Sequence, residues 1–109
     1  MNSKELIDEL KMLEGKRVAF AIGFESAASL NVTEVMPLPP DQRLNNSGNV
    51  IIHNGVRDKN GNPEGVTLRA RDVADVVWVD DVTCLLYNKY GNTICLLIVK
   101  SLGETYNEV

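Results

Sequence analysis

The clearest structural signal in this chain is the stretch VTCLLYNKYGNTICLLIVK, residues 82–100. Two apolar runs flank the polar segment 88–92, and Asn and Gly between apolar runs are typical of a β-hairpin. The runs are apolar at successive positions, so we expect strands that are covered on both faces. A four-residue loop over 88–91 would place Cys84 opposite Cys95 across the hairpin.

The two cysteines have three interpretations. We expect them to be reduced and buried, because an unpaired cysteine in an apolar run behaves as a small hydrophobe. A disulfide or redox switch is one alternative, and half of a metal site is another. Two cysteines and the single histidine, His53, supply three ligands without any CxxC spacing, so we expect no metal and no cofactor.

An amphipathic helix is predicted over residues 3–14. Leucine and isoleucine recur there at three- and four-residue spacing, while charged residues occupy the opposite face. Asn2 and Glu5 have the spacing of a capping box, and Gly15 is expected to end the helix.

Two strands are predicted after this helix. Residues 16–24 alternate between large apolar and small or charged side chains, which is the period of a β-strand. Residues 25–29 are interpreted as a turn. The run 30–36 alternates again, and we expect Leu30 and Val32 to point inward.

The rest of the chain continues this mainly β pattern. Prolines and polar residues predict a long loop over 38–49, which is either functional or disordered. Segments 49–56 and 65–73 flank turn residues and predict a second hairpin, and 74–79 predicts one more strand. The tail 101–109 is polar.

The order of elements predicts a single domain over 1–109, mainly β with one N-terminal α-helix, built as a small antiparallel β-barrel of about five or six strands over 16–100. This order resembles the Sm-like and SH3-like small β-barrel proteins. GKRVAFAIG with LNVTEVM resembles an Sm1 segment, whose second strand ends in an acidic residue and a methionine, here Glu34 and Met36. Pro37 stands where that family has asparagine, and no Arg-Gly pair ends the fourth strand. The resemblance implies ring-forming assembly and RNA binding.

Composition excludes several classes of function. The chain has 109 residues, with 15 acidic and 11 basic side chains and a net charge of -4, which is the wrong sign for holding duplex DNA. The N-terminus lacks the apolar region of a signal peptide, and no run reaches the roughly 20 apolar residues of a membrane span. We therefore expect a cytoplasmic protein without a membrane partner.

The candidate ligand-binding residues are Arg69, Arg71, His53 and Asn54. Arg69 and Arg71 are two residues apart on a predicted strand, so both guanidinium groups would project from one face and suit a phosphate. A register with Val56 opposite Thr67 would put Asn54 opposite Arg69. The alternative is a solvated face neutralised by Asp58, Asp72 or Asp75.

A protein interface is the second kind of candidate site. Trp78 is the sole tryptophan and is either a core residue or an aromatic anchor of an interface, together with Tyr87 and Tyr90. The aspartates near Trp78 would suit a basic protein partner.

Three functions therefore stay open. The first is a non-catalytic binding module that is homo-oligomeric through an exposed strand edge at 93–100 and holds a phosphate-bearing ligand, a nucleotide or RNA. The second is an acidic adaptor or inhibitor that binds another protein. The third is an enzyme of unfamiliar type that uses His53 with Cys84 or Cys95, since the common catalytic motifs are absent.

Overall fold

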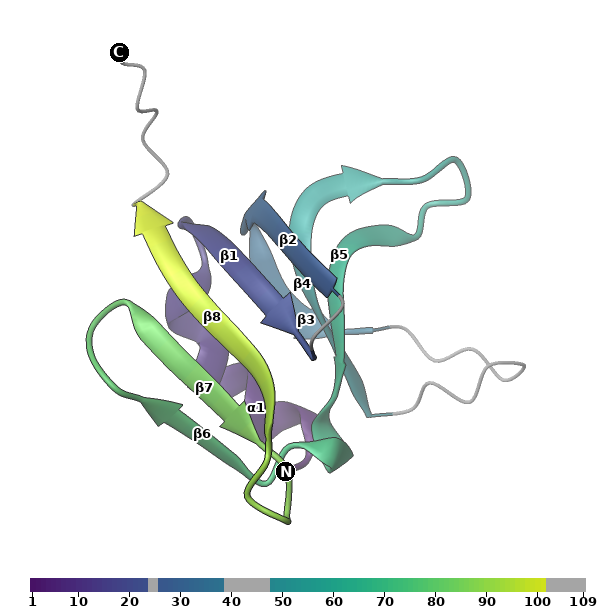
Figure 1. Cartoon of the computed structure of the whole chain (residues 1–109). Helices are drawn as coiled ribbons and strands as arrows, with labels where there is room; N and C mark the ends of the chain where they lie inside the picture. Colours follow the sequence, from purple (N-terminus) through teal and green to yellow (C-terminus); the bar gives the residue numbers. More distant parts are fainter. Residues whose placement is uncertain (24–25, 39–47, 102–109) are drawn as a thin grey trace.

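The computed structural model describes residues 1–23, 26–38 and 48–101 (Figure 1). Its helices are α1 (Ser3–Leu10), η1 (Lys11–Leu13) and η2 (Ala70–Asp72), the last two being short 3-10 helices. Its strands are β1 (Arg17–Ile22), β2 (Ser26–Asn31), β3 (Glu34–Pro37), β4 (Asn49–Arg57), β5 (Pro63–Arg69), β6 (Asp75–Trp78), β7 (Thr83–Tyr87) and β8 (Thr93–Ser101). Most of the predicted loop 38–49 and of the predicted tail 101–109 lies outside the described residues.

The predicted fold class, mainly antiparallel β with one N-terminal α-helix, is confirmed. The described residues form eight strands rather than five or six. They make a five-stranded sheet in the order β2-β1-β8-β7-β6 and a three-stranded sheet in the order β3-β4-β5. We call these the large sheet and the small sheet.

Strand β8 lies in the middle of the large sheet, between β1 and β7 (Figure 1). Its backbone groups pair on both sides, for example with Phe20 of β1 and Cys84 of β7 at Leu97. The prediction of a free strand edge at 93–100 is therefore wrong. The last strand of the chain, β8, pairs with the first, β1, and with β7. The edges of the large sheet are therefore β2 and β6.

The N-terminal helix begins as the sequence predicts. Asn2 Oδ1 accepts a hydrogen bond from the Glu5 amide at 2.8 Å, and Glu5 Oε1 accepts one from the Asn2 amide at 2.9 Å, which completes the capping box. The α-helical part ends at Leu10, and η1 takes the chain on to Leu13. Gly15 then reverses the chain with φ of 83°.

The core lies between the two sheets and the helix. Figure 1 shows α1 behind β7 and β8, and α1 also contacts β3, β4 and η2. The helix buries Leu6 and Leu10 completely, and η1 buries Leu13. The strands contribute apolar side chains from both sheets, among them Val18, Phe20, Val35, Ile52, Leu86 and Leu97.

One predicted strand is two strands in the structure. The run 30–36 is split between β2 and β3, and the chain crosses from the large to the small sheet at Val32 and Thr33. The predicted turn 25–29 is wrong over its small residues, because these form most of β2 and pair with β1. Pairing with a neighbouring strand here overrides the weak strand preference of serine and alanine. Val32 is buried as expected, and Leu30 packs at the margin of the core.

A membrane crossing would take a longer and more apolar helix than any that the described residues form.

Candidate functional site

The two predicted anion-binding arginines do not share a strand face. Arg69 is the last residue of β5 and lies opposite Asn49, whereas Arg71 belongs to η2. The predicted register, with Val56 opposite Thr67, is wrong, because Ile51 takes that place. The register shifts between His53 and Arg57, and this bulge was not visible in the alternation of the sequence.

His53 and Asn54 lie away from both arginines. His53 is 5% exposed, its Nδ1 is 2.9 Å from the Glu64 carbonyl oxygen, and it lies opposite Gly65. Four residues of strand, roughly 13 Å, separate that position from Arg69. Asn54 Oδ1 accepts a hydrogen bond from the Val56 amide at 2.9 Å within the bulge. The structure thus does not bring the four predicted ligand-binding residues together.

The three aromatic residues of the predicted interface have different environments. Trp78 is half-buried and packs against the core. Tyr87 is half-buried at the end of β7, opposite Asp75. Tyr90 is 76% exposed, in the turn between β7 and β8.

The two cysteines are free and buried, as predicted. Burial raises the pKa of both thiols to about 12, so neither is a thiolate at neutral pH. The predicted pairing of Cys84 with Cys95 is wrong, since Cys84 lies opposite Leu97 and Cys95 opposite Leu86. The described residues hold no group of three or more His, Cys, Asp or Glu side chains that could bind a metal ion.

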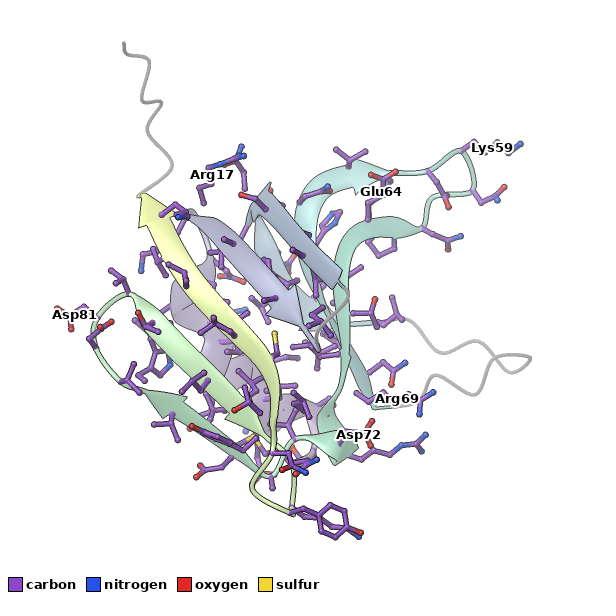
Figure 2. The ribbon with its side chains drawn as sticks, viewed as in Figure 1. Arg17, Lys59, Glu64, Arg69, Asp72 and Asp81 are labelled. Carbon is purple, nitrogen blue, oxygen red and sulfur yellow. The ribbon has the colours of Figure 1, made fainter. Side chains whose placement is uncertain are left out.

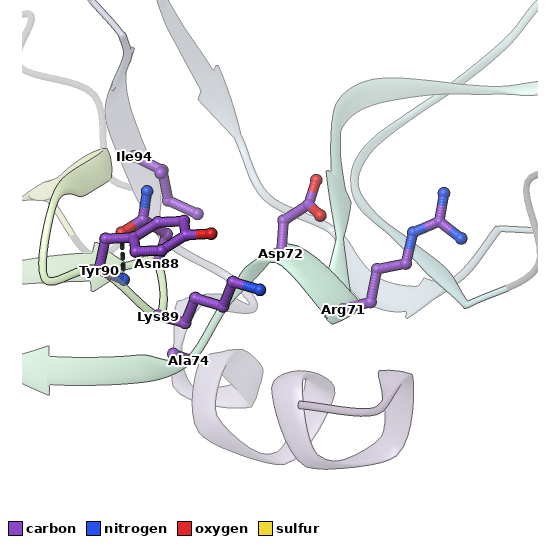
Figure 3. A pocket seen from close by; sticks show the side chains of 7 residues that line it. All are labelled: Arg71, Asp72, Ala74, Asn88, Lys89, Tyr90 and Ile94. Atoms are coloured by element: carbon purple, nitrogen blue, oxygen red, sulfur yellow. Dashed lines mark hydrogen bonds between the residues drawn. The ribbon is translucent and has the colours of Figure 1, made fainter.

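A surface hollow of about 390 Å³ lies between η2 and the β7–β8 turn (Figure 3). We call it the Tyr90 hollow. Its lining combines two cations, one carboxylate, one amide, one aromatic ring and two apolar side chains: Arg71, Lys89, Asp72, Asn88, Tyr90, Ala74 and Ile94. A volume of this size is in the range of small-molecule sites in proteins.

The turn 88–92, which we call the hollow turn, presents Tyr90 and Lys89. Asn88 Oδ1 accepts hydrogen bonds from the Tyr90 amide at 2.9 Å and the Asn92 amide at 3.0 Å. The Asn88 amide donates to the Asn92 carbonyl at 2.9 Å, and Gly91 has φ of 83°. These bonds fix the backbone of the turn, and the Tyr90 side chain lies exposed beside the hollow.

Sheet pairing brings η2 to the hollow turn. The Ala74 amide, directly before β6, donates to the Tyr87 carbonyl at 2.8 Å. Residues 70–74 therefore lie next to the end of β7, where the hollow turn begins. Figure 2 shows Arg69 and Asp72 at this same corner of the molecule.

The charges of the hollow are not paired internally. Neither Arg71 nor Lys89 has an ion pair with another described residue, and the same holds for Asp72. Lys89 Nζ lies 5.2 Å from the centre of the Tyr90 ring. Figure 3 shows Asp72 between the side chains of Lys89 and Arg71. The hollow therefore offers two cationic groups, an exposed aromatic face and one acceptor.

The sequence indicates Arg71 and Tyr90 as separate candidates, and it does not indicate Lys89, Asn88 or Ile94 as site residues. A signal for the turn was present in the similarity of DKNGN, residues 58–62, to NKYGN, residues 88–92. No sequence signal places η2 beside the second of these turns, because that contact depends on the strand order.

No known protein family, curated protein or solved structure matches this chain. The resemblance to Sm-like proteins therefore stays a prediction, and so do the ring assembly and RNA binding that it implies.

Proposed function

We propose that the protein is a non-catalytic binding module that holds a phosphate-bearing ligand, a nucleotide or a nucleotide unit of RNA, in the Tyr90 hollow. The observation that carries the proposal is that Arg71 and Lys89 both line one hollow, beside an exposed aromatic ring. The two cations come from segments far apart in the sequence. Such convergence suits an anion better than a random scatter of surface charge.

Each group has a role in this proposal. The Tyr90 ring offers a stacking platform for a base, because any base has a π-face that an exposed aromatic ring can cover. Arg71 and Lys89 contact the phosphate. Asp72 lies between the two cations, so its negative charge lowers their attraction for the phosphate, while its oxygens can accept from a ribose hydroxyl or a base amino group. Ile94 and Ala74 form the apolar floor.

The alternatives have weaker support. An adaptor that uses Trp78 as its anchor needs that ring at the surface, whereas Trp78 packs against the core. An enzyme that uses His53 with a cysteine needs an accessible base and a thiolate, whereas His53 is buried and both thiols have a pKa of about 12. A cytoplasmic location, which the sequence predicts, would supply nucleotides and RNA.

The test is a titration followed by NMR of the backbone amides. AMP is expected to shift the amides of residues 71–74 and 88–92, and adenosine, which lacks the phosphate, to bind more weakly. Lys89→Ala and Arg71→Ala should each weaken AMP binding by about fivefold, or about 1 kcal/mol. The effect is modest because the contacts of these cations with the phosphate are exposed to water.

The matched control is Lys59→Ala. Lys59 has the same position in the turn 58–62 as Lys89 has in the hollow turn, and Figure 2 shows it at a distant tip of the molecule. Lys59→Ala removes the same charge as Lys89→Ala, so a nonspecific attraction between the protein and AMP would fall equally in both variants. Equal weakening by Lys59→Ala, or no amide shifts with AMP or with a short single-stranded RNA, would contradict the proposal.

A further inference from the structure

The large sheet has one face that no described element covers. Alternate residues of its strands, such as Phe20, Leu86 and Leu97, point into the core toward α1. The residues between them point to the opposite side, which we call the outer face. Figure 1 shows this face toward the viewer, with α1 behind it.

The outer face is apolar and unequal in its two halves. The central strand β8 contributes Leu96 and Ile98, both partly buried. On one side, β7 and β6 carry large residues, represented by Leu85 and Val77. On the other side, β1 and β2 carry small residues.

The large and small residues occupy the same rows across the sheet, so that each row lies at one level along the strand direction. Ala21 and Leu85 are both opposite Leu96 of β8, one from each side. Further out, Ala27 is opposite Ala21, and Val77 is opposite Leu85. One row across the sheet therefore reads Ala27, Ala21, Leu96, Leu85, Val77.

We propose that the outer face packs against the outer face of a second copy of this chain, about a two-fold axis that runs along β8. Such an axis puts β1 of one copy over β7 of the other and β2 over β6. Small side chains then meet large ones at the same level, while β8 packs on β8. Aligned sheets pack in this way at a spacing of about 10 Å.

Charge complementarity selects this axis. Ala19 and Thr83 are both opposite Ile98, and Arg17 and Asp81 each lie two residues earlier in the chain. Arg17, at the start of β1, and Asp81, in the bend before β7, therefore lie toward the same end of the large sheet on either side of β8 (Figure 2). The proposed axis brings Arg17 of each copy to Asp81 of the other. Neither side chain has an ion pair with a described residue of its own copy.

A dimer whose two-fold axis runs perpendicular to β8, across the strands, is disfavoured. A two-fold axis across the strands would place β6 on β6 in the reverse direction. Asp75, at the start of β6, would then approach Asp80 and Asp81, just beyond its end. These contacts bring like charges together.

The size of the face predicts a weak dimer. Five strands spaced about 4.8 Å apart and about six residues of about 3.3 Å give roughly 480 Å² on each copy, or roughly 1,000 Å² in total. Stable complexes bury about 1,200–2,000 Å². The dimer is therefore expected to form at micromolar or higher concentration.

Sedimentation equilibrium from low micromolar to millimolar concentration tests the proposal. The mass of the natural chain should rise above 12.0 kDa toward the dimer. Leu96→Glu places two like charges at the axis and should keep the protein monomeric. The control Val56→Glu adds the same charge at an exposed position of β4, in the small sheet, and should leave the dimer intact. Circular dichroism of both variants confirms folding.

A charge swap gives the second test. Arg17→Asp and Asp81→Arg should each raise the dimer Kd by about tenfold, and the double variant should restore it. This rescue does not depend on Leu96 or on the Tyr90 hollow. A natural chain that stays monomeric at every concentration would overturn the proposal. So would a dimer that survives Leu96→Glu, since that dimer would use a strand edge or another surface.

Discussion

Two turns of this molecule have the same backbone and different surroundings. The arm turn, residues 58–62, joins β4 to β5, and the hollow turn, residues 88–92, joins β7 to β8. In the arm turn, Asp58 Oδ1 accepts from the Asn60 and Asn62 amides at 2.8 and 3.0 Å. The hollow turn has the same pair of bonds to its first residue, Asn88, at 2.9 and 3.0 Å. The glycines of the two turns have φ of 84° and 83°.

The two turns share the residues that their backbone conformation requires and differ at a position that this conformation leaves free. The shared bonds require a short polar acceptor at the first position and a glycine at the fourth. They place no demand on the third position, which is Asn60 in one turn and Tyr90 in the other. The 76% exposed Tyr90 ring is therefore not explained by the turn. Figure 1 shows the arm turn at the tip of an extension, whereas the hollow turn lies beside η2.

The largest expected effect comes from exchanging the third residues. Tyr90→Asn should weaken AMP binding by about tenfold or more, because stacking on an aromatic ring contributes about 1–3 kcal/mol per base. The reciprocal Asn60→Tyr should gain little binding, since the arginine next to the arm turn, Arg57, already donates a hydrogen bond to the Gly61 carbonyl at 2.9 Å. Calorimetric titration measures both. A large fall of Tm in Tyr90→Asn would instead assign the ring a structural role.

The two glycines should have equal effects on stability. Ala at Gly61 or Gly91 puts a Cβ in the left-handed region, which costs about 1–2 kcal/mol. No heavy atom outside the neighbouring residues lies within 4 Å of either added Cβ, so backbone strain is the whole cost. Urea unfolding of the two variants measures it. Clearly unequal costs would show that the two turns differ in more than their side chains.

The sequence predicted local features well and strand pairing poorly. The capping box of Asn2, the hairpin over 82–100 and the buried cysteines depend on neighbours in the chain or on the strength of an apolar run. Cys84 lies opposite Leu97, two residues beyond its predicted partner Cys95. One residue of this shift arises because the loop closes between Asn88 and Asn92, and the other because Ile94 forms a bulge. A bulge forms where packing across the sheet favours it, and a single sequence does not show that packing.

The candidate site was predictable only in parts. Arg71 drew attention by its charge and Tyr90 by its aromatic ring within a turn. Their shared hollow follows from the pairing of β6 with β7, which places η2 beside the hollow turn. The prediction that Arg69 and Arg71 share a strand face was wrong, because β5 ends at Arg69 and the chain then turns into η2. Contacts between distant segments set the site, and these follow from topology.

The smallest expected effect is a difference in acid sensitivity between the two turns. The Asn62 amide, followed by the Asn60 amide and the Asn62 side chain, holds the pKa of Asp58 below its ordinary value of 3.8. Asn88 has no charge to lose. A carboxyl with a lowered pKa contributes its stability above the unfolded-state pKa, and this contribution is lost as pH falls through the lower folded-state pKa. Acid therefore weakens the arm turn and spares the hollow turn.

Two substitutions exchange this property. Asp58→Asn gives the arm turn the first residue of the hollow turn, and Asn88→Asp does the reverse. Relative to the natural chain, Asp58→Asn should become more favourable as pH falls below about 4, and Asn88→Asp less favourable. Urea unfolding between about pH 2 and 7 measures both differences, while other titrating groups such as Asp80 cancel in the comparison. A difference that does not change with pH would mean that the hydrogen bonds to Asp58 are no stronger for the carboxylate than for the neutral amide.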